Sequence, residues 1–285
     1  MLVHIKDIVK KAEKGKYAVG AFNVHNIESV LGIAQAAVRA HSPAIIQVSE
    51  STIEYMGVKP ITHIVSTAAK NIAAKVPIAL HLDHGKSFHS VSECINAGFS
   101  SVHIDASEFP LDENISLTKN VVSVAHAKNV WVQGEVGAIV GGHGQVSGFV
   151  KGIQLAKLED VIEFVRATHV DTIAAAVGTA HGVFKNEDIR FALLKKIVEK
   201  TKKTPFVLHG GSGIDDLKIK RAIREGVRII NIGTDIKVAF SKTLIRNCIK
   251  NKKETDPRHL LKPTIKAVEN VVYKKMRVFG SAGKA

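Results

Sequence analysis

The chain has 285 residues, of which 45% are hydrophobic and 23% are charged, and its formal net charge at pH 7 is +14. This size and composition fit one large globular domain or two small ones and exclude a low-complexity chain. The apolar runs are shorter than the roughly 20 residues that span a bilayer. Aromatic residues, at 5%, are too few for a base-stacking nucleic-acid platform. We therefore expect neither a membrane nor a nucleic acid as partner.

The cysteines and the charge pattern favour a cytoplasmic protein. Residues 1–17 mix charges with apolar side chains and lack the continuous apolar core of a signal peptide. Cys94 and Cys248 form no CxxC pair, which fits a reducing compartment better than a disulfide framework. Lysines lie along expected helix faces such as residues 193–203, where they are solvated and add a general attraction for anions, including phosphorylated metabolites.

Short β-rich runs alternate with amphipathic helical stretches along the whole chain, and no linker divides it. Helical periodicity is clear at residues 29–40 and 158–168. The predicted strands cover residues 17–24, 43–50, 76–83, 101–107, 130–137, 172–180, 205–211 and 227–235. Eight β-α repeats predict a single (β/α)8 TIM barrel over residues 1–285. The rival, a doubly wound sheet, usually carries a Gly-rich turn after its first strand, and the sequence AFNVHNIES has none.

Polar or metal-capable side chains end nearly every predicted strand. They are Asn23, Ser49, Asp83, His84, Asp105, Glu135, His181, His209, Ser212, Asn231, Thr234 and Asp235. In a TIM barrel the carboxyl ends of the strands form the active-site face. So many polar ends on one rim are hard to explain by core packing, so they indicate an active site.

Three histidines, His84, His181 and His209, each end a predicted strand and precede a glycine. A single histidine at a strand end is more often a hydrogen-bonded structural residue. Three at equivalent positions of one barrel favour a catalytic Zn²⁺ site, which commonly uses three imidazoles and an open position. His81 and His103 lie within predicted strands, with side chains expected either in the barrel or under a helix, and His81 is a candidate partner of a metal ligand.

Carboxylates accompany these histidines. Asp83 directly precedes His84, and a carboxylate beside a metal can move protons as acid or base, or can orient a histidine. Asp105 and Glu135 end neighbouring strands and are candidates for oxygen ligands or for acceptors of backbone hydrogen bonds.

The loops after the seventh and eighth strands are candidates for phosphate binding. They read LHGGSGI (208–214) and INIGTD (230–235). Glycines let backbone N–H groups approach an anion, and serine and threonine add hydroxyl donors. Barrels often hold phosphate at these two loops. The candidate substrate-binding residues here are Gly210, Gly211, Ser212, Asn231, Gly233, Thr234 and Asp235, with Gly182 from the motif GTAHG.

The motifs taken together resemble the class II, zinc-dependent ketose-bisphosphate aldolases over nearly the whole chain. The motifs, in order, are AFNVHNIES, LHLDHG, GFSSVHIDAS, GTAHG, LHGGSG, DPRHLLKP and RVFGSAGKA. LHLDHG is highly specific for this family. Its members act on fructose bisphosphate, on tagatose bisphosphate, or on a deoxy-keto-gluconate phosphate of inositol breakdown.

The resemblance implies roles for the motif residues. His84, His181 and His209 would bind Zn²⁺, and Asp83 would be the acid/base at the C4 oxygen. Asp105 and Glu135 match positions that approach the metal or hold it in an alternative place. Dihydroxyacetone phosphate would bind at Gly182, Gly210, Ser212, Asn231 and Thr234, with further substrate contacts from Asn23 and Ser49. Main-chain oxygens near Gly182, Gly210 and Ser212 would hold Na⁺ or K⁺. Arg258 would grip the far phosphate from a neighbouring subunit, which implies a homodimer or homotetramer.

The chain also departs from the family pattern. The family's mobile loop carries an acidic pair, but here the loop is GGHGQVSG (141–148), with Gly144 and Gln145 at the acidic positions. We predict that His143 takes the role of the loop acid. Gln133 replaces a family glutamate, and Ser107-Glu108 replaces Ser-His.

The sequence therefore predicts zinc-dependent reversible aldol cleavage of fructose 1,6-bisphosphate to dihydroxyacetone phosphate and glyceraldehyde 3-phosphate. Tagatose 1,6-bisphosphate and the deoxy-keto-gluconate phosphate are alternative phosphorylated ketose substrates. A catalytically impaired sugar-phosphate-binding protein is the alternative of another class. A zinc hydrolase on a barrel would share the histidines and carboxylate but not the paired phosphate loops.

Overall fold

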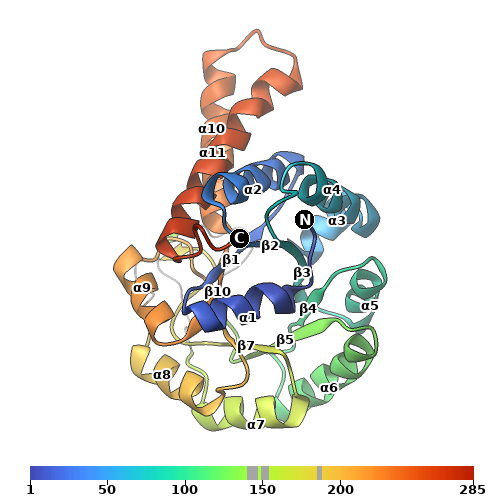
Figure 1. The fold of residues 1–285 in the computed structure, drawn as a ribbon, viewed down its shortest axis with the longest axis vertical. Helices are drawn as coiled ribbons and strands as arrows, with labels where there is room; N and C mark the ends of the chain where they lie inside the picture. The colour runs from blue at the N-terminus through green and yellow to red at the C-terminus, as the bar shows by residue number, and fades with distance from the viewer. Residues whose placement is uncertain (140–146, 149–153, 185–187) are drawn as a thin grey trace.

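The computed structural model describes residues 1–139, 147–148, 154–184 and 188–285. In this part of the chain eight parallel strands close into a barrel in the order β1-β10-β9-β7-β5-β4-β3-β2 (Figure 1). The barrel strands are β1 (Val19–Asn23), β2 (Ala44–Ser49), β3 (Ile78–Gly85), β4 (Ser101–Ile104), β5 (Trp131–Val136), β7 (Thr172–Ala175), β9 (Phe206–Leu208) and β10 (Val227–Ile232). The predicted (β/α)8 barrel is confirmed, and each predicted strand overlaps an observed one.

Helices surround the barrel, as Figure 1 shows. They are α1 (Ile5–Gly15), α2 (Ile27–Ala40), α3 (Glu50–Met56), α4 (Val58–Asn71), α5 (Phe88–Asn96), α6 (Leu111–Ala127), α7 (Leu158–Thr168), α8 (Phe191–Lys200), α9 (Asp216–Arg224), α10 (Thr234–Lys250) and α11 (Pro257–Val278). Because helices cover the outside and side chains fill the inside, the strands are buried on both faces. This explains why they read as near-continuous apolar runs.

Four predicted strands are too long at their carboxyl ends by three or more residues. The prediction 172–180 corresponds to a strand that ends at Ala175, because the chain then leaves the barrel toward Gly178, whose φ of 102° favours glycine. The strands predicted at 101–107, 205–211 and 227–235 end at Ile104, Leu208 and Ile232. A small parallel pair, β6 (Ser147–Gly148) with β8 (Val183–Phe184), was not predicted.

The amino-terminal mouth of the barrel is closed by α1, which lies across it in Figure 1. Ile5, Ile8 and Val9 of α1 form one buried cluster with barrel-lining residues such as Ala21 and Val207. Packing at this end fills the barrel with apolar side chains. The opposite, carboxyl end is where polar side chains gather.

The hairpin of α10 and α11 projects beyond the ring of helices (Figure 1), and α11 packs along α2. A salt bridge of 3.1 Å joins Arg39 of α2 to Glu269 of α11. The close approach depends on Gly32, because a Cβ there would lie 2.8 Å from the carbonyl oxygen of Ile265 and from Cβ of Val268. Among the described residues, no helix combines the length and apolar character needed to cross a membrane.

Replacing Gly32 with alanine should therefore push α11 away from α2. We expect Gly32→Ala to lower the free energy of unfolding by about 1–3 kcal/mol, the usual cost of overpacking, measured by urea denaturation. The matched control is Gln35→Ala on the exposed face of the same helix, which should stay within about 0.5 kcal/mol of the wild type. Equal stability of Gly32→Ala and wild type would contradict the close packing.

Candidate active site

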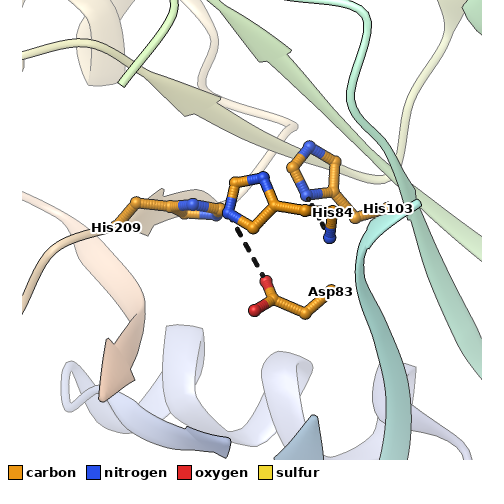
Figure 2. Close-up of side chains that lie close together, drawn as sticks. All are labelled: Asp83, His84, His103 and His209. Atoms are coloured by element: carbon orange, nitrogen blue, oxygen red, sulfur yellow. Dashed lines mark hydrogen bonds and ion pairs between the residues drawn. The ribbon is translucent and has the colours of Figure 1, made fainter. Parts of the chain in front are cut away.

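The end of β3 presents two neighbouring side chains to the same rim. His84 has a φ of 50°, in the left-handed region that is unfavourable for residues other than glycine. The pairing of β3 with β4 shifts register between Leu82 and Gly85. The strand therefore turns at this point instead of alternating faces, and the Asp83 carboxylate lies 3.8 Å from Nε2 of His84 (Figure 2). The expectation that both side chains reach the rim is confirmed.

The three predicted zinc histidines meet at this rim. The ring centroid of His84 lies 4.9 Å from that of His181 and 4.9 Å from that of His209, and the last two lie 5.6 Å apart. His84 lies within β3, and His209 directly follows β9. His181 does not end its strand as predicted. It lies in the loop between β7 and β8, which brings it back to the other two rings.

The donors around these rings fit a divalent cation. Nε2 of His84 and Nδ1 of His209 are buried and have no hydrogen-bond partner among the described residues. In the same part of the chain, two groups of metal-capable atoms lie within 4.8 Å of one another. They are Asp83, His84, His103 and His209, and His84, His103, Asp105 and Glu135. Figure 2 shows the first group gathered around the His84 ring. Imidazoles with carboxylates are the donor set of zinc and similar ions.

The buried charges favour positive charge at this place. Burial alone would lower the pKa of His84, but Asp83, the hydrogen bond to Asp105 and the charge of Glu135 outweigh it and raise this pKa to about 10. Burial lowers the pKa of His209 well below its ordinary value, and the neighbouring histidines add to the effect, so this ring is neutral. A neutral imidazole can act as a ligand, and a cation can balance the carboxylates.

Asp83 is held in place by a network of amides. Its Oδ2 accepts a hydrogen bond of 2.7 Å from Nδ2 of Asn23, and its Oδ1 lies 3.5 Å from Nδ2 of Asn231. Gln47 in turn donates to Oδ1 of Asn23 at 2.8 Å. Burial raises the pKa of Asp83, but His84 and the bond from Asn23 outweigh it and keep this pKa below its ordinary value. The carboxylate is therefore ionised and able to accept a proton. Sequence reasoning found Asn23 and Asn231 but missed Gln47.

Asp105 and Glu135 differ in their surroundings. Asp105 lies 2.6 Å from Nδ1 of His84 and 2.7 Å from the Ser107 hydroxyl, and these contacts outweigh burial and hold its pKa well below the usual range. Glu135 is buried, and burial together with the charge of Asp105 raises its pKa to about 8. Its Oε1 accepts the N–H of Ile139 at 3.2 Å. Asp105 therefore orients His84. Glu135 accepts a backbone hydrogen bond through Oε1, and its Oε2 has no hydrogen-bond partner among the described residues.

Two residues that the sequence did not assign to the site contact its histidines. The amide of Gln133 lies 2.8 Å from Nε2 of His209, so the residue noted as a family departure touches a candidate ligand. The ring of His103, expected either in the barrel or under a helix, lies 4.8 Å from that of His84. Both side chains face the barrel interior near its carboxyl end. The alternation of side chains along a strand does not by itself show which of the two faces is the interior.

The glycine-rich loops pack tightly beside the histidines. Gly210 has a φ of 67°, and a Cβ there would lie 2.3 Å from the carbonyl oxygen of Ala180. The N–H of Gly211 donates to the carbonyl of Asn231 at 3.1 Å. The Ser212 hydroxyl accepts the N–H of Asp235 at 3.2 Å. These contacts join the loop after β9 to the start of α10.

The remaining predicted residues are placed as follows. Gly233 and Thr234 begin α10, whose first turn has no side-chain cap among the described residues. The carboxylate of Asp235 is paired with Lys275 of α11 at 2.9 Å. Ser49 lies at the start of α3, with its hydroxyl 3.0 Å from that of Ser51. Gly182 follows His181, with a φ of 150°.

Arg258 is not brought to the site within one chain. Arg258 lies at the start of α11, beside the turn at the outer end of the projecting hairpin (Figure 1). Its side chain is 87% exposed and pairs with Asp256 at 2.7 Å. Within one chain it is therefore separated from the histidines. His143 lies outside the described residues.

The fold and the site define a TIM barrel with a buried histidine and carboxylate centre suited to a metal ion. A family model described as "Fructose-bisphosphate aldolase class-II" matches residues 3–284. The chain belongs to this family of zinc-dependent aldolases, which are carbon–carbon lyases acting on phosphorylated sugars.

Individual relatives agree with this family. The chain is 41% identical to a fructose-bisphosphate aldolase of Geobacillus stearothermophilus, over 100% of this chain and 99% of the relative. It is 40% identical to a 6-phospho-5-dehydro-2-deoxy-D-gluconate aldolase of Bacillus subtilis strain 168, over 99% and 97% of the two chains. The crystal structure of the YdjI aldolase from Escherichia coli K12 superposes with a TM-score of 0.86 at 31% identity, covering 100% of both chains.

Gly210 offers a test of how the His181 segment is positioned. A Cβ at Gly210 would collide with Ala180, directly before His181, so we expect Gly210→Ala to weaken divalent-cation binding by at least about tenfold. Chelator competition with the metal-free protein measures the affinity. Gly98→Ala is the control, because Gly98 also has a positive φ, 96°, but nothing lies within 4 Å of its added Cβ. Unchanged cation affinity in Gly210→Ala would contradict this positioning.

Proposed function

We propose that the chain catalyses the zinc-dependent, reversible aldol cleavage of fructose 1,6-bisphosphate to dihydroxyacetone phosphate and glyceraldehyde 3-phosphate. The observation that supports this most strongly is the meeting of three histidine rings beside the ionised carboxylate of Asp83. The name of the 41% identical relative favours the same substrate. In this proposal residues 1–285 act as one barrel domain in the cytoplasm.

His84, His181 and His209 are the proposed zinc ligands, and Asp105 and Glu135 are oxygen donors next to them. The buried nitrogens of His84 and His209 and the surrounding carboxylates are what such an ion requires. When bound, zinc supplies Lewis-acid stabilisation of negative charge on the substrate oxygens. Asp105 keeps His84 oriented through its 2.6 Å contact with Nδ1, which leaves Nε2 directed to the centre.

Asp83 is the proposed acid/base. In cleavage its carboxylate takes the proton of the C4 hydroxyl as the C3–C4 bond breaks, and the bonding electrons remain on the triose-phosphate carbon. In condensation the same group returns the proton to the C4 oxygen. The amides of Asn23 and Asn231 hold the carboxylate at a fixed place, so that it is aligned for this transfer.

The glycine-rich loops are the proposed site for the dihydroxyacetone phosphate part. Backbone N–H groups at Gly210 and Gly233, and at the start of α10, would receive the phosphate. The proposed substrate-binding residues are Asn23, Ser49, Gly182, Gly210, Gly211, Ser212, Asn231, Gly233, Thr234, Asp235 and Arg258. Because the Asp235 carboxylate is paired with Lys275 and its N–H with the Ser212 hydroxyl, its proposed contribution is indirect, through Ser212. A monovalent cation, Na⁺ or K⁺, is proposed at main-chain oxygens near Gly182, Gly210 and Ser212.

The name of the 40% identical relative favours a second substrate class. That relative is named as an aldolase of 6-phospho-5-dehydro-2-deoxy-D-gluconate. That substrate or tagatose 1,6-bisphosphate would use the same metal and the same acid/base. Product analysis separates these aldolases from the remaining alternatives. A catalytically impaired binding protein would release no triose phosphate, and a hydrolase would release inorganic phosphate or an alcohol.

Arg258 leads us to propose a homodimer or homotetramer. In one chain this arginine is exposed at the end of a projecting hairpin. A guanidinium binds phosphate well, and a hairpin that extends from one barrel can reach the site of a neighbouring subunit. In that arrangement Arg258 would bind the second phosphate of the substrate.

Chelation tests the proposed reaction directly. We expect the protein to release triose phosphate from fructose 1,6-bisphosphate, EDTA to abolish the release and added Zn²⁺ to restore it. His84→Ala should behave like the chelated protein, whereas His89→Ala, at an exposed histidine, should keep full activity. Metal-independent cleavage would contradict the proposal. No cleavage of any of the three sugar phosphates by the zinc-loaded protein would favour lost catalysis.

Mixed oligomers test whether Arg258 acts across the subunit interface. Asp83→Asn should lower kcat by about 10²–10⁴, the usual worth of an acid/base group. Arg258→Ala should lower kcat/KM at least tenfold, since a charged hydrogen bond contributes about 1.5–3 kcal/mol. Coexpressed in equal amounts, the two variants should recover about a quarter of wild-type activity, because half of the symmetric dimers are mixed and each has one complete site. No recovery would place Arg258 in its own chain's site or outside any site.

The loop residue His143 is proposed to move the proton at the triose-phosphate carbon. His143→Ala should therefore slow exchange of that proton with solvent, measured by deuterium incorporation into dihydroxyacetone phosphate, and reduce cleavage. Full cleavage activity and unchanged exchange would contradict this role.

A further inference from the structure

The imidazole of His103 has no part in the chemistry described so far. It lies in β4 and is fully buried. Burial, reinforced by the charge of His84, lowers its pKa to about 3, so the ring is neutral. Its Nδ1 accepts the backbone N–H of His84 at 3.3 Å. Its Nε2 has no hydrogen-bond partner in the part of the chain that the structure describes. A buried nitrogen without a partner in a native protein requires a reason.

The surroundings of His103 supply such a reason. Nε2 lies 4.0 Å from Oε2 of Glu135, which also lacks a hydrogen-bond partner among the described residues. The ring centroid lies 4.8 Å from that of His84 and 5.4 Å from that of His209. Both groups of metal-capable atoms in the described chain contain His103, and His84 is the other residue they share. His103 is therefore central to the donor cluster.

We propose that His103 binds the metal ion of this centre through Nε2, as a fourth imidazole on the side of Glu135, so that the ion would become five-coordinate when it binds a substrate oxygen. This inference rests on the metal centre of the proposed function but not on the identity of the sugar. Ligation through Nε2 requires the ring proton to lie on Nδ1. The hydrogen bond that Nδ1 accepts from the backbone N–H of His84 would therefore break when the ion binds. At 3.3 Å this hydrogen bond is already long. A set dominated by imidazole nitrogens suits Zn²⁺, Co²⁺ and similar first-row divalent ions.

His81 provides a matched control within the same barrel. It is also a buried histidine, in β3, and burial lowers its pKa to about 4. Its Nδ1 lies 2.9 Å from the Ser101 hydroxyl, and its Nε2 lacks a partner among the described residues, as that of His103 does. His81 nevertheless belongs to neither group of metal-capable atoms found in the described chain. Proximity to the other donors, and not burial alone, distinguishes His103.

The test is cobalt binding by the full-length, metal-free protein. Competition with a chromophoric chelator gives the affinity, and the visible d–d absorption of bound Co²⁺ reports its ligands. We expect His103→Asn to weaken Co²⁺ binding by about tenfold or more and to change the position and intensity of the d–d bands. His81→Asn removes no proposed ligand and should keep the wild-type positions and intensities of the d–d bands. A wild-type spectrum and affinity in His103→Asn, or equal changes in both variants, would overturn the proposal.

A second measurement applies if His103→Asn does not fold. X-ray absorption of the zinc-loaded wild-type protein counts the imidazoles bound to the ion. Four imidazoles are expected, and three would overturn the role of His103. Neither measurement needs turnover, so an inactive protein with four imidazoles on its metal would refute the proposed function and leave this inference standing.

Discussion

The backbone turn at the end of β3 is the feature on which the site depends. A regular strand would direct Asp83 and His84 to opposite faces, one into the barrel and one toward the helices. The positive φ of His84 and the shift in register with β4 bring both to the rim. Such a conformation is unfavourable for a residue with a side chain, and strain of this kind is commonly found at functional sites. The ligand and the acid/base of the proposed chemistry are thereby placed side by side.

The barrel then places further polar side chains around this turn. Parallel strands closed into a ring place all carboxyl ends on one rim, so side chains far apart in sequence surround Asp83 and His84. Amides from β1 and β10 hold the Asp83 carboxylate. Asp105 fixes the ring of His84 from the next strand. Because these groups are buried, their charges interact strongly with one another. The excess of carboxylates therefore favours a cation at the centre.

The sequence predicted the barrel and most of this rim because both follow from simple periodicities. Strand and helix patterns alternate along the chain, and polar residues such as Asn23 and Asp83 follow apolar runs where strands end. Prediction was weaker for features that tertiary packing determines. The strand ending at Ala175 is shorter than its apolar pattern, so His181 reaches the site from a loop. His103 and Gln133 lie within strands, and only the closed barrel shows that both face the candidate ligands. The contact of α11 with α2 depends on a close approach at Gly32 that has no local sequence signal.

The closed barrel is proposed to assemble one metal centre from His84, His181 and His209. The most direct test is a crystal structure of the zinc-loaded protein with anomalous diffraction data collected at the zinc absorption edge. We expect a strong peak about 2.0–2.1 Å from a ring nitrogen of each of these histidines, next to the Asp83 carboxylate. A zinc peak elsewhere, or no zinc bound at this rim, would contradict it.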